Sequence, residues 1–102
     1  MSYALADLVQ LLVTERGDAI HLHDREAPVL ELHGILHRVE GPPLEVGDTQ
    51  TLFRSFAPKK EFQAMSLDGL AVFEHAFGHP NFFRVMAFRE DDSLRLELRR
   101  IL

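Results

Sequence analysis

The most constraining feature of the sequence is a strict alternation of leucine and charged residues near the C-terminus. The alternating residues are Leu94, Arg95, Leu96, Glu97, Leu98 and Arg99. Successive side chains of a strand point to opposite faces, so this pattern predicts a strand with one buried and one solvated face. The preceding residues 82–89 are almost wholly apolar, which predicts a central strand that is covered on both faces or packed under helices. Residues 90–93 are polar and predict a hairpin turn between the two strands.

Apolar spacing and turn-forming residues divide the rest of the chain into seven further elements. The predicted elements are a helix over 2–15, strands over 18–23, 29–32 and 35–39, a helix starting at Asp48, a helix from Pro58 to about Met65 and a strand over 70–75. Ser2 and Asp48 are the predicted N-caps, and Gly17 is predicted to end the first helix in a left-handed conformation. His33 and Gly34 predict a tight turn between the second and third strands.

This order of elements defines the expected fold class. Short turns favour antiparallel pairing, with the helices on one face of the sheet. We therefore predict a single α+β domain over residues 1–102, PAS-like in layout, with about six antiparallel strands and the order αβββααβββ. A chain of 102 residues is long enough for one core but not for two.

Composition excludes several classes of protein. The net charge is −5, and the only lysines are the adjacent Lys59 and Lys60, so a nucleic-acid-binding surface is not expected. No apolar run approaches the ~20 residues of a membrane span, so no membrane insertion is expected. The sequence has no cysteine, which excludes disulfides and thiol catalysis and favours a cytoplasmic location.

Catalytic motifs are absent from the sequence. No Gly-x-x-x-x-Gly-Lys-Ser/Thr run occurs, which excludes a P-loop ATPase for this chain alone, and no Gly-x-Ser-x-Gly elbow occurs. His21 and His23 point the same way from one predicted strand, and His33 could join them from the next. A metal site on these three imidazoles is a weak alternative to ordinary sheet histidines. We expect no enzyme activity and no cofactor.

The phenylalanines leave two interpretations open. They are Phe53, Phe56, Phe62, Phe73, Phe82, Phe83 and Phe88. They could line a ligand pocket, as in a free-standing PAS-like sensor of a small molecule. At these spacings such residues more often form the core of the fold.

Two blocks of residues carry a family resemblance. The first is Asp18-Ala19-Ile20-His21-Leu22, Ala27-Pro28, Val29-Leu30-Glu31-Leu32, His33-Gly34 and Leu36-His37-Arg38-Val39. The second is Phe82-Phe83-Arg84-Val85-Met86-Ala87-Phe88 with Leu98-Arg99-Arg100-Ile101. Together with the helical region 48–65, these blocks resemble the N-terminal domain of the PilT-type pilus-retraction ATPases, of the bacterial type II/IV secretion ATPase superfamily. The sequence departs from the family pattern at Ala19, His33, Phe82 and Met86, and it contains no Walker motif.

The resemblance implies a function. In the family, this domain packs against the ATPase domain of the neighbouring subunit in a hexameric ring, where its arginines can approach the nucleotide phosphates. Arg84 and Arg99 are the positions onto which that role would carry, because a guanidinium binds phosphate oxygens with two donors. The alternative for Arg84 is an ion pair with Glu97 across the hairpin. The implied protein is a non-catalytic interaction or oligomerisation module of a type IV pilus retraction (twitching motility) ATPase, either part of a longer chain or free-standing. Its implied partner is an ATPase domain or a second copy of itself.

Overall fold

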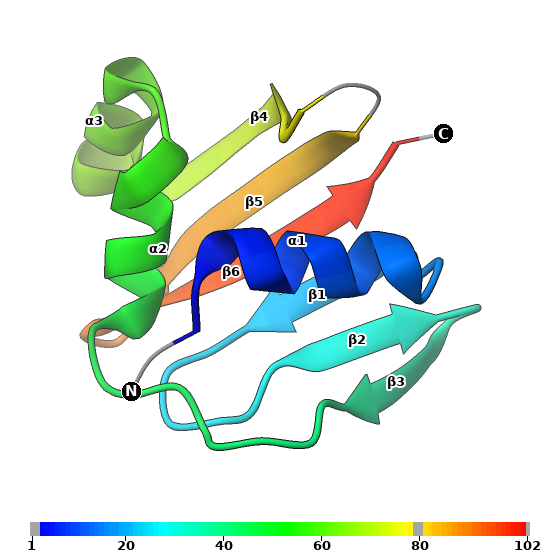
Figure 1. Cartoon of the computed structure of the whole chain (residues 1–102). Coiled ribbons are helices and arrows are strands. Elements are labelled where there is room, and N and C mark those ends of the chain that lie inside the picture. The colour runs from blue at the N-terminus through cyan, green and yellow to red at the C-terminus, as the bar shows by residue number, and fades with distance from the viewer. Residues whose placement is uncertain (1–2, 79–80, 102) are drawn as a thin grey trace.

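The chain folds into a six-stranded antiparallel sheet with three helices (Figure 1). The computed structural model describes residues 3–78 and 81–101. The elements are α1 (Leu5–Thr14), β1 (Ala19–Leu22), β2 (Val29–Leu32), β3 (Ile35–Arg38), α2 (Asp48–Phe56), α3 (Lys59–Asp68), β4 (Leu70–Ala76), β5 (Phe82–Glu90) and β6 (Ser93–Arg100). The predicted α+β class and the order αβββααβββ are confirmed.

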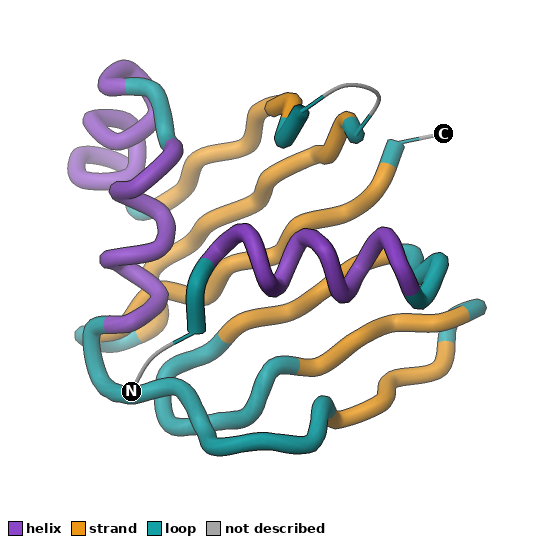
Figure 2. The backbone as a smooth tube through the Cα atoms, in the orientation of Figure 1, coloured by secondary structure: helices purple, strands orange, loops and turns teal. Residues whose placement is uncertain are grey.

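The strands lie side by side in the order β3-β2-β1-β6-β5-β4. The β5–β6 hairpin is therefore in the interior of the sheet, as predicted, with β6 joining the two halves by pairing with both β1 and β5. Its turn contains Asp91 at a φ of 59°. Figure 2 shows the strands as one continuous layer with α1 lying in front of it.

The core lies between the sheet and the helices. Ile20, Phe83, Val85, Leu96 and Leu98 are completely buried on the face that α1 and α2 cover. Leu8 and Leu12 of α1, together with Phe53 of α2, fill the space above these side chains. Burial of large apolar side chains at this one interface supplies the main driving force for folding.

Of the two alternatives for residues 82–89, coverage on both faces is wrong, and packing under the helices on one face is what the structure has. Burial alternates along β5, where Phe83, Val85 and Ala87 are buried while Phe82 and Arg84 are exposed. The reason is that all three helices lie on one side of the sheet, so nothing in the described chain covers the other side of β5 (Figure 1). Alternate residues of this apolar run therefore form part of an exposed apolar surface, and the sheet has no second core on that side.

Two predicted helix ends differ from the structure. Ser2 lies outside the described residues, and α1 begins at Leu5 with Ala4 as its N-cap. The left-handed residue after α1 is Arg16, with a φ of 55°, and not Gly17. Gly17 is instead constrained by packing, because a Cβ atom there would lie 2.9 Å from side-chain carbons of both Leu12 and Leu30.

The predicted N-cap of α2 is also wrong. Asp48 is the first helical residue, and Gly47, with a φ of 91°, is the N-cap. The Asp48 carboxylate accepts a hydrogen bond from the N–H of Glu45, in the loop before the helix. Two N–H groups at the start of α2, those of Gly47 and Thr49, donate to the carboxylate of Asp24, a residue of the loop that follows β1.

Candidate interaction face

The side of the sheet that faces away from the helices is the candidate functional surface, and we call it the open face. Strand register places the following side chains on it: His21, Glu31, Leu70, Val72, Glu74, Phe82, Arg84, Met86, Phe88, Arg95, Glu97 and Arg99. The β4–β5 half is mainly apolar, and the β1–β2–β6 half is charged. A sheet face of this size that is left without helices is a typical site for another protein surface.

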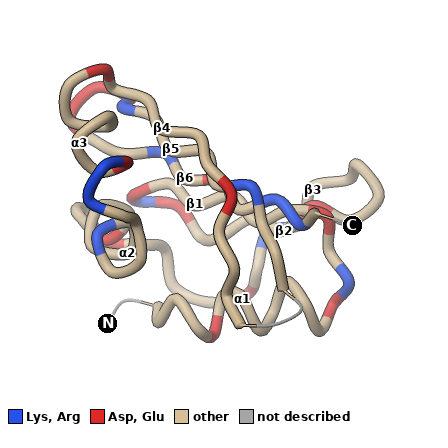
Figure 3. The backbone as a smooth tube through the Cα atoms, turned by 90° about the horizontal axis from the view of Figure 1, so that it is seen from above, with Lys and Arg blue, Asp and Glu red and all other residues tan. Residues whose placement is uncertain are grey.

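Charge on the molecule is mixed. Figure 3 shows acidic and basic segments interspersed over helices and strands, without one continuous basic stripe. Among the described residues, no helix is long and apolar enough to cross a membrane.

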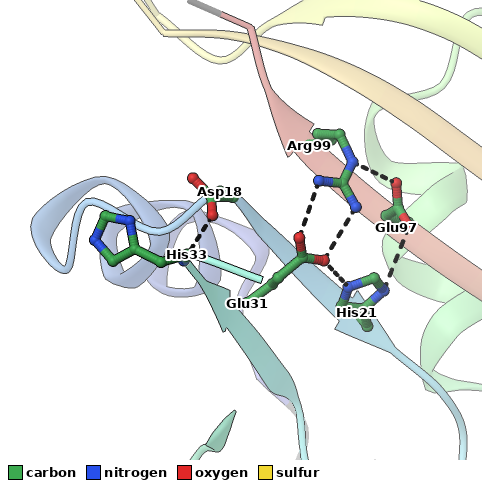
Figure 4. Close-up of polar contacts among 6 residues, drawn as sticks. All are labelled: Asp18, His21, Glu31, His33, Glu97 and Arg99. Carbon is green, nitrogen blue, oxygen red and sulfur yellow. Dashed lines mark hydrogen bonds and ion pairs between the residues drawn. The ribbon is translucent and has the colours of Figure 1, made fainter. Parts of the chain in front are cut away.

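Arg99 is the centre of the charged half of the open face (Figure 4). Its guanidinium donates to both carboxylate oxygens of Glu31, at 3.2 and 3.0 Å, and its Nε donates to Glu97 at 3.1 Å. Glu31 comes from β2 and Arg99 from β6, with β1 between them. The side chains meet above Ala19, which pairs in register with both residues and is fully buried beneath them.

These contacts shift the ionisation of the groups involved. Hydrogen bonds from Arg99 and then His21 lower the pKa of Glu31, against the opposing effect of burial. The same bond to Glu31 raises the pKa of Arg99. Arg99 is thus already bound to two carboxylates of its own chain.

Arg84, the other predicted contact residue, has a much freer side chain. It is 55% exposed, and its charged partner is Glu74 of β4, at a long distance of 3.9 Å. The alternative pairing of Arg84 with Glu97 does not occur, because Arg99 holds Glu97. Arg84 and Arg99 are opposite each other in the β5–β6 register, so both lie on the open face but only Arg84 is available without breaking a strong ion pair.

The three histidines of the weak metal-site prediction do not converge. His21 lies between Glu31 and Glu97, at 3.1 and 3.4 Å. His23 lies between Glu26 and Glu90, at 2.8 and 3.1 Å. His33 is in the β2–β3 turn, where its backbone N–H donates to Asp18 and its ring points away from His21 (Figure 4). Within residues 3–78 and 81–101, no group of three or more potential ligands is placed to hold a metal ion.

Asp24 is a structurally important residue that the sequence pattern did not reveal. Its side chain is only 3% exposed, and it accepts hydrogen bonds from the N–H groups of Gly47 and Thr49 and from the hydroxyls of Thr49 and Ser93. Burial raises the pKa of Asp24, but the hydrogen bonds outweigh it, so that the net shift is downward. Asp24 therefore links the start of α2, through Gly47 and Thr49, to Ser93 at the turn of the β5–β6 hairpin by hydrogen bonds.

A cleft of about 330 Å³ opens beside Asp24, between α2, α3 and β6. Phe53, Phe62 and Met65 form its apolar wall, and Gln50 and Arg89 are among its polar residues. The aromatic rings around Phe53 pack on one another, with centroids 5.9 Å away for Phe56 and 6.1 Å away for Phe62. Most of the aromatic cluster is thus core, as the sequence favoured, and only its edge reaches the cleft.

Comparison with solved structures connects this architecture to a known group. The crystal structure of the pilus retraction motor PilT with bound ADP matches 99% of this chain with a TM-score of 0.90 and 22% sequence identity. This chain has the fold of the N-terminal domain of PilT-type ATPases. The ATPase DotB from Legionella pneumophila matches all of the chain with a TM-score of 0.79 and 15% identity. DotB from Yersinia pseudotuberculosis matches 99% of it with a TM-score of 0.76 and 12% identity.

The chain spans 30% of the PilT and Legionella DotB chains and 31% of the Yersinia DotB chain. No protein-family model and no curated protein sequence matches it. The family resemblance noted in the sequence is confirmed at the level of the fold.

Proposed function

We propose that this domain is a non-catalytic docking module that binds an ATPase domain of the PilT type, within a hexameric motor or as its regulator. The observation that supports this proposal is the fit of the whole domain to a part of PilT, at a TM-score of 0.90 over 99% of the chain. The open face supplies a surface for the contact, because it is broad, partly apolar and free of helices.

Arg84 is the residue we assign to the partner contact. Its side chain is more than half exposed and its ion pair with Glu74 is long, so turning toward a partner costs the domain little. A guanidinium suits acidic side chains and phosphate oxygens equally well. In the proposed complex Arg84 reaches the partner's acidic or nucleotide-bearing surface, and Arg99 stays bound to Glu31 and Glu97.

The test is co-purification of this domain with a purified PilT-type ATPase domain. Arg84→Ala is expected to weaken capture about tenfold, the effect of one lost charged contact. Lys59→Ala is the matched control, because Lys59 is an exposed cation at the start of α3, away from the open face. Equal capture of the Arg84 and Lys59 variants would remove Arg84 from the interface. Failure of the unaltered domain to bind would reject the docking function.

A small-ligand sensor is the second candidate, and the cleft beside α2 is the observation that favours it. Its volume of about 330 Å³ is at the lower end of the range for ligand sites. Native mass spectrometry of the purified domain tests this candidate. A bound small molecule that is lost on Phe62→Ala would support it, and a spectrum with the apoprotein mass alone would oppose it.

A further inference from the structure

Strand β4 is the last strand at one end of the sheet (Figure 2). Among the described strands, only β5 pairs with it, over all seven residues and without a bulge. A long, regular edge strand exposes unpaired backbone groups and is a template for pairing with another chain. Many proteins block such an edge with lysine or proline, but β4 has neither.

The hydrogen bonds at the two ends of β4 show which backbone groups face outward. The N–H of Arg89 donates to Gly69 O, and the N–H of Phe77 donates to Asn81 O, both at 2.9 Å. Both bonds fit the β4–β5 register, and bonded and non-bonded pairs alternate in an antiparallel ladder. The odd-numbered residues of β4 therefore bond to β5. The even-numbered residues, Leu70, Val72, Glu74 and Ala76, direct their N–H and C=O groups away from the sheet.

We propose that a second copy of this chain adds its own β4 antiparallel to this edge, which joins the two sheets into one. Pairing Leu70 with Ala76 of the second copy and Val72 with Glu74 of the second copy uses all four outward-facing residues on each side. A shift by one pair in one direction would set Glu74 against Glu74 of the second copy. A shift in the other direction would leave Ala76 unpaired. The proposed register is thus the one that satisfies the most backbone groups and keeps the two glutamates apart.

Side chains on the open face fit the same register. Leu70 and Val72 are each 48% exposed and Phe82 is 46% exposed. Leu70 lies beside Phe88, and Ala76 lies beside Phe82. In the proposed pair, Leu70 also meets Ala76 of the second copy, so that one apolar row runs from Phe88 of one chain to Phe82 of the other. The two-fold symmetry creates this row twice, which buries part of the exposed apolar surface.

This inference does not rest on the proposed function, because edge pairing leaves Arg84 and the charged half of the open face accessible. Analytical ultracentrifugation over a range of concentrations tests it. The expected result is a shift in mass from 11.7 kDa to twice that value as the concentration of the chain rises. Hydrogen exchange at the high concentration should show added protection at the amides of Leu70, Val72, Glu74 and Ala76.

Two variants assign the dimer to this edge. Val72→Pro removes an outward N–H without removing a bond to β5 and should raise the dimer Kd about tenfold or more. Val72→Thr is the matched control, because it keeps the N–H and the β-branched shape. Leu70→Lys should also weaken the dimer, because it places a charge in the apolar row. It keeps every backbone N–H group, so it tests the edge even if the proline variant does not fold. A mass of 11.7 kDa up to millimolar concentration, or a dimer unaffected by both Val72→Pro and Leu70→Lys, would overturn the inference.

Discussion

Arg99 of β6 and Glu31 of β2 form a bidentate ion pair across β1, the strand that lies between theirs. Arg99 Nη1 and Nη2 lie 3.2 and 3.0 Å from the two carboxylate oxygens of Glu31, and β1 runs between them. The small side chain of Ala19 makes the crossing possible, since a larger residue there would separate the two groups. The pair thus connects the β2–β3 half of the sheet to the β6–β5–β4 half on the open face.

A double-mutant cycle should detect this connection. Glu31→Gln, Arg99→Gln and the double variant are compared by urea denaturation. Because the ion pair is bidentate and partly buried, the coupling free energy between Glu31 and Arg99 should be about 1 kcal/mol, above that of ordinary surface pairs. The cycle of Glu74→Gln with Arg84→Gln is the control and should give close to zero. Equal coupling in both cycles would mean that the Arg99 cluster has no special role in the sheet.

Asp24 should matter more to stability than the neighbouring Asp48. Asp24→Ala leaves the N–H groups of Gly47 and Thr49 without their acceptor and should lower the free energy of unfolding by about 2–3 kcal/mol. Asp48→Ala removes a single hydrogen bond, to the N–H of Glu45, and should cost about 1 kcal/mol. Thermal or urea denaturation measures both. The reverse order of effects would show that Asp48 is the effective cap of α2.

Acid should destabilise the domain through Asp24 and Glu31. Both carboxyl groups have a folded-state pKa below their ordinary values of 3.8 and 4.5. Their contribution to stability is therefore complete above those values and is lost as the pH falls through the lower folded-state pKa. The free energy of unfolding should be flat above about pH 5 and should decline below about pH 4. Asp24→Asn should make the decline shallower, and an unchanged decline would exclude Asp24 as a cause.

Gly17 should resist substitution for a steric reason. A Cβ atom there would lie 2.9 Å from Leu12 and Leu30 side-chain carbons and 3.3 Å from the carbonyl oxygen of Glu31. Gly17→Ala should therefore cost about 1–3 kcal/mol through overpacking. Gly34→Asn is the control. Gly34 has a φ of 80°, which asparagine tolerates, and a Cβ atom there would meet no atom of the described chain within 4 Å beyond its two neighbours. A neutral Gly17→Ala would show that the neighbouring leucines move aside easily.

The sequence predicted the features that depend on local pattern. Alternation of Leu94, Leu96 and Leu98 with charged residues identified β6, and His33-Gly34 identified the β2–β3 turn, because both signals lie within a few residues. Short turns between the strands also predicted that the helices lie on one face of the sheet. The apolar run of β5 does not show which of its residues point away from those helices, because that depends on contacts between residues distant in the chain. The exposure of Phe82 and Arg84 therefore could not be obtained from the run itself.

The missed contacts join residues that are distant in the chain. Arg99 and Glu31 are separated by 68 positions, and Asp24 is 25 positions from Thr49. The sequence around a single charged residue does not show whether its side chain is solvated or forms an ion pair or hydrogen bond with a distant residue. The one available signal for Asp24 was its place between a buried strand and a proline, and that signal is too common to identify a buried carboxylate.

Chemical-shift mapping tests the docking proposal most directly. The ¹⁵N-labelled domain is titrated with an unlabelled PilT-type ATPase domain, and amide shifts are followed by NMR. We expect the largest changes at open-face residues around Arg84, including Glu74, Met86 and Glu97, while the amides of α1 change little. Changes confined to α1 and α2, or no changes at saturating partner concentration, would contradict the docking proposal.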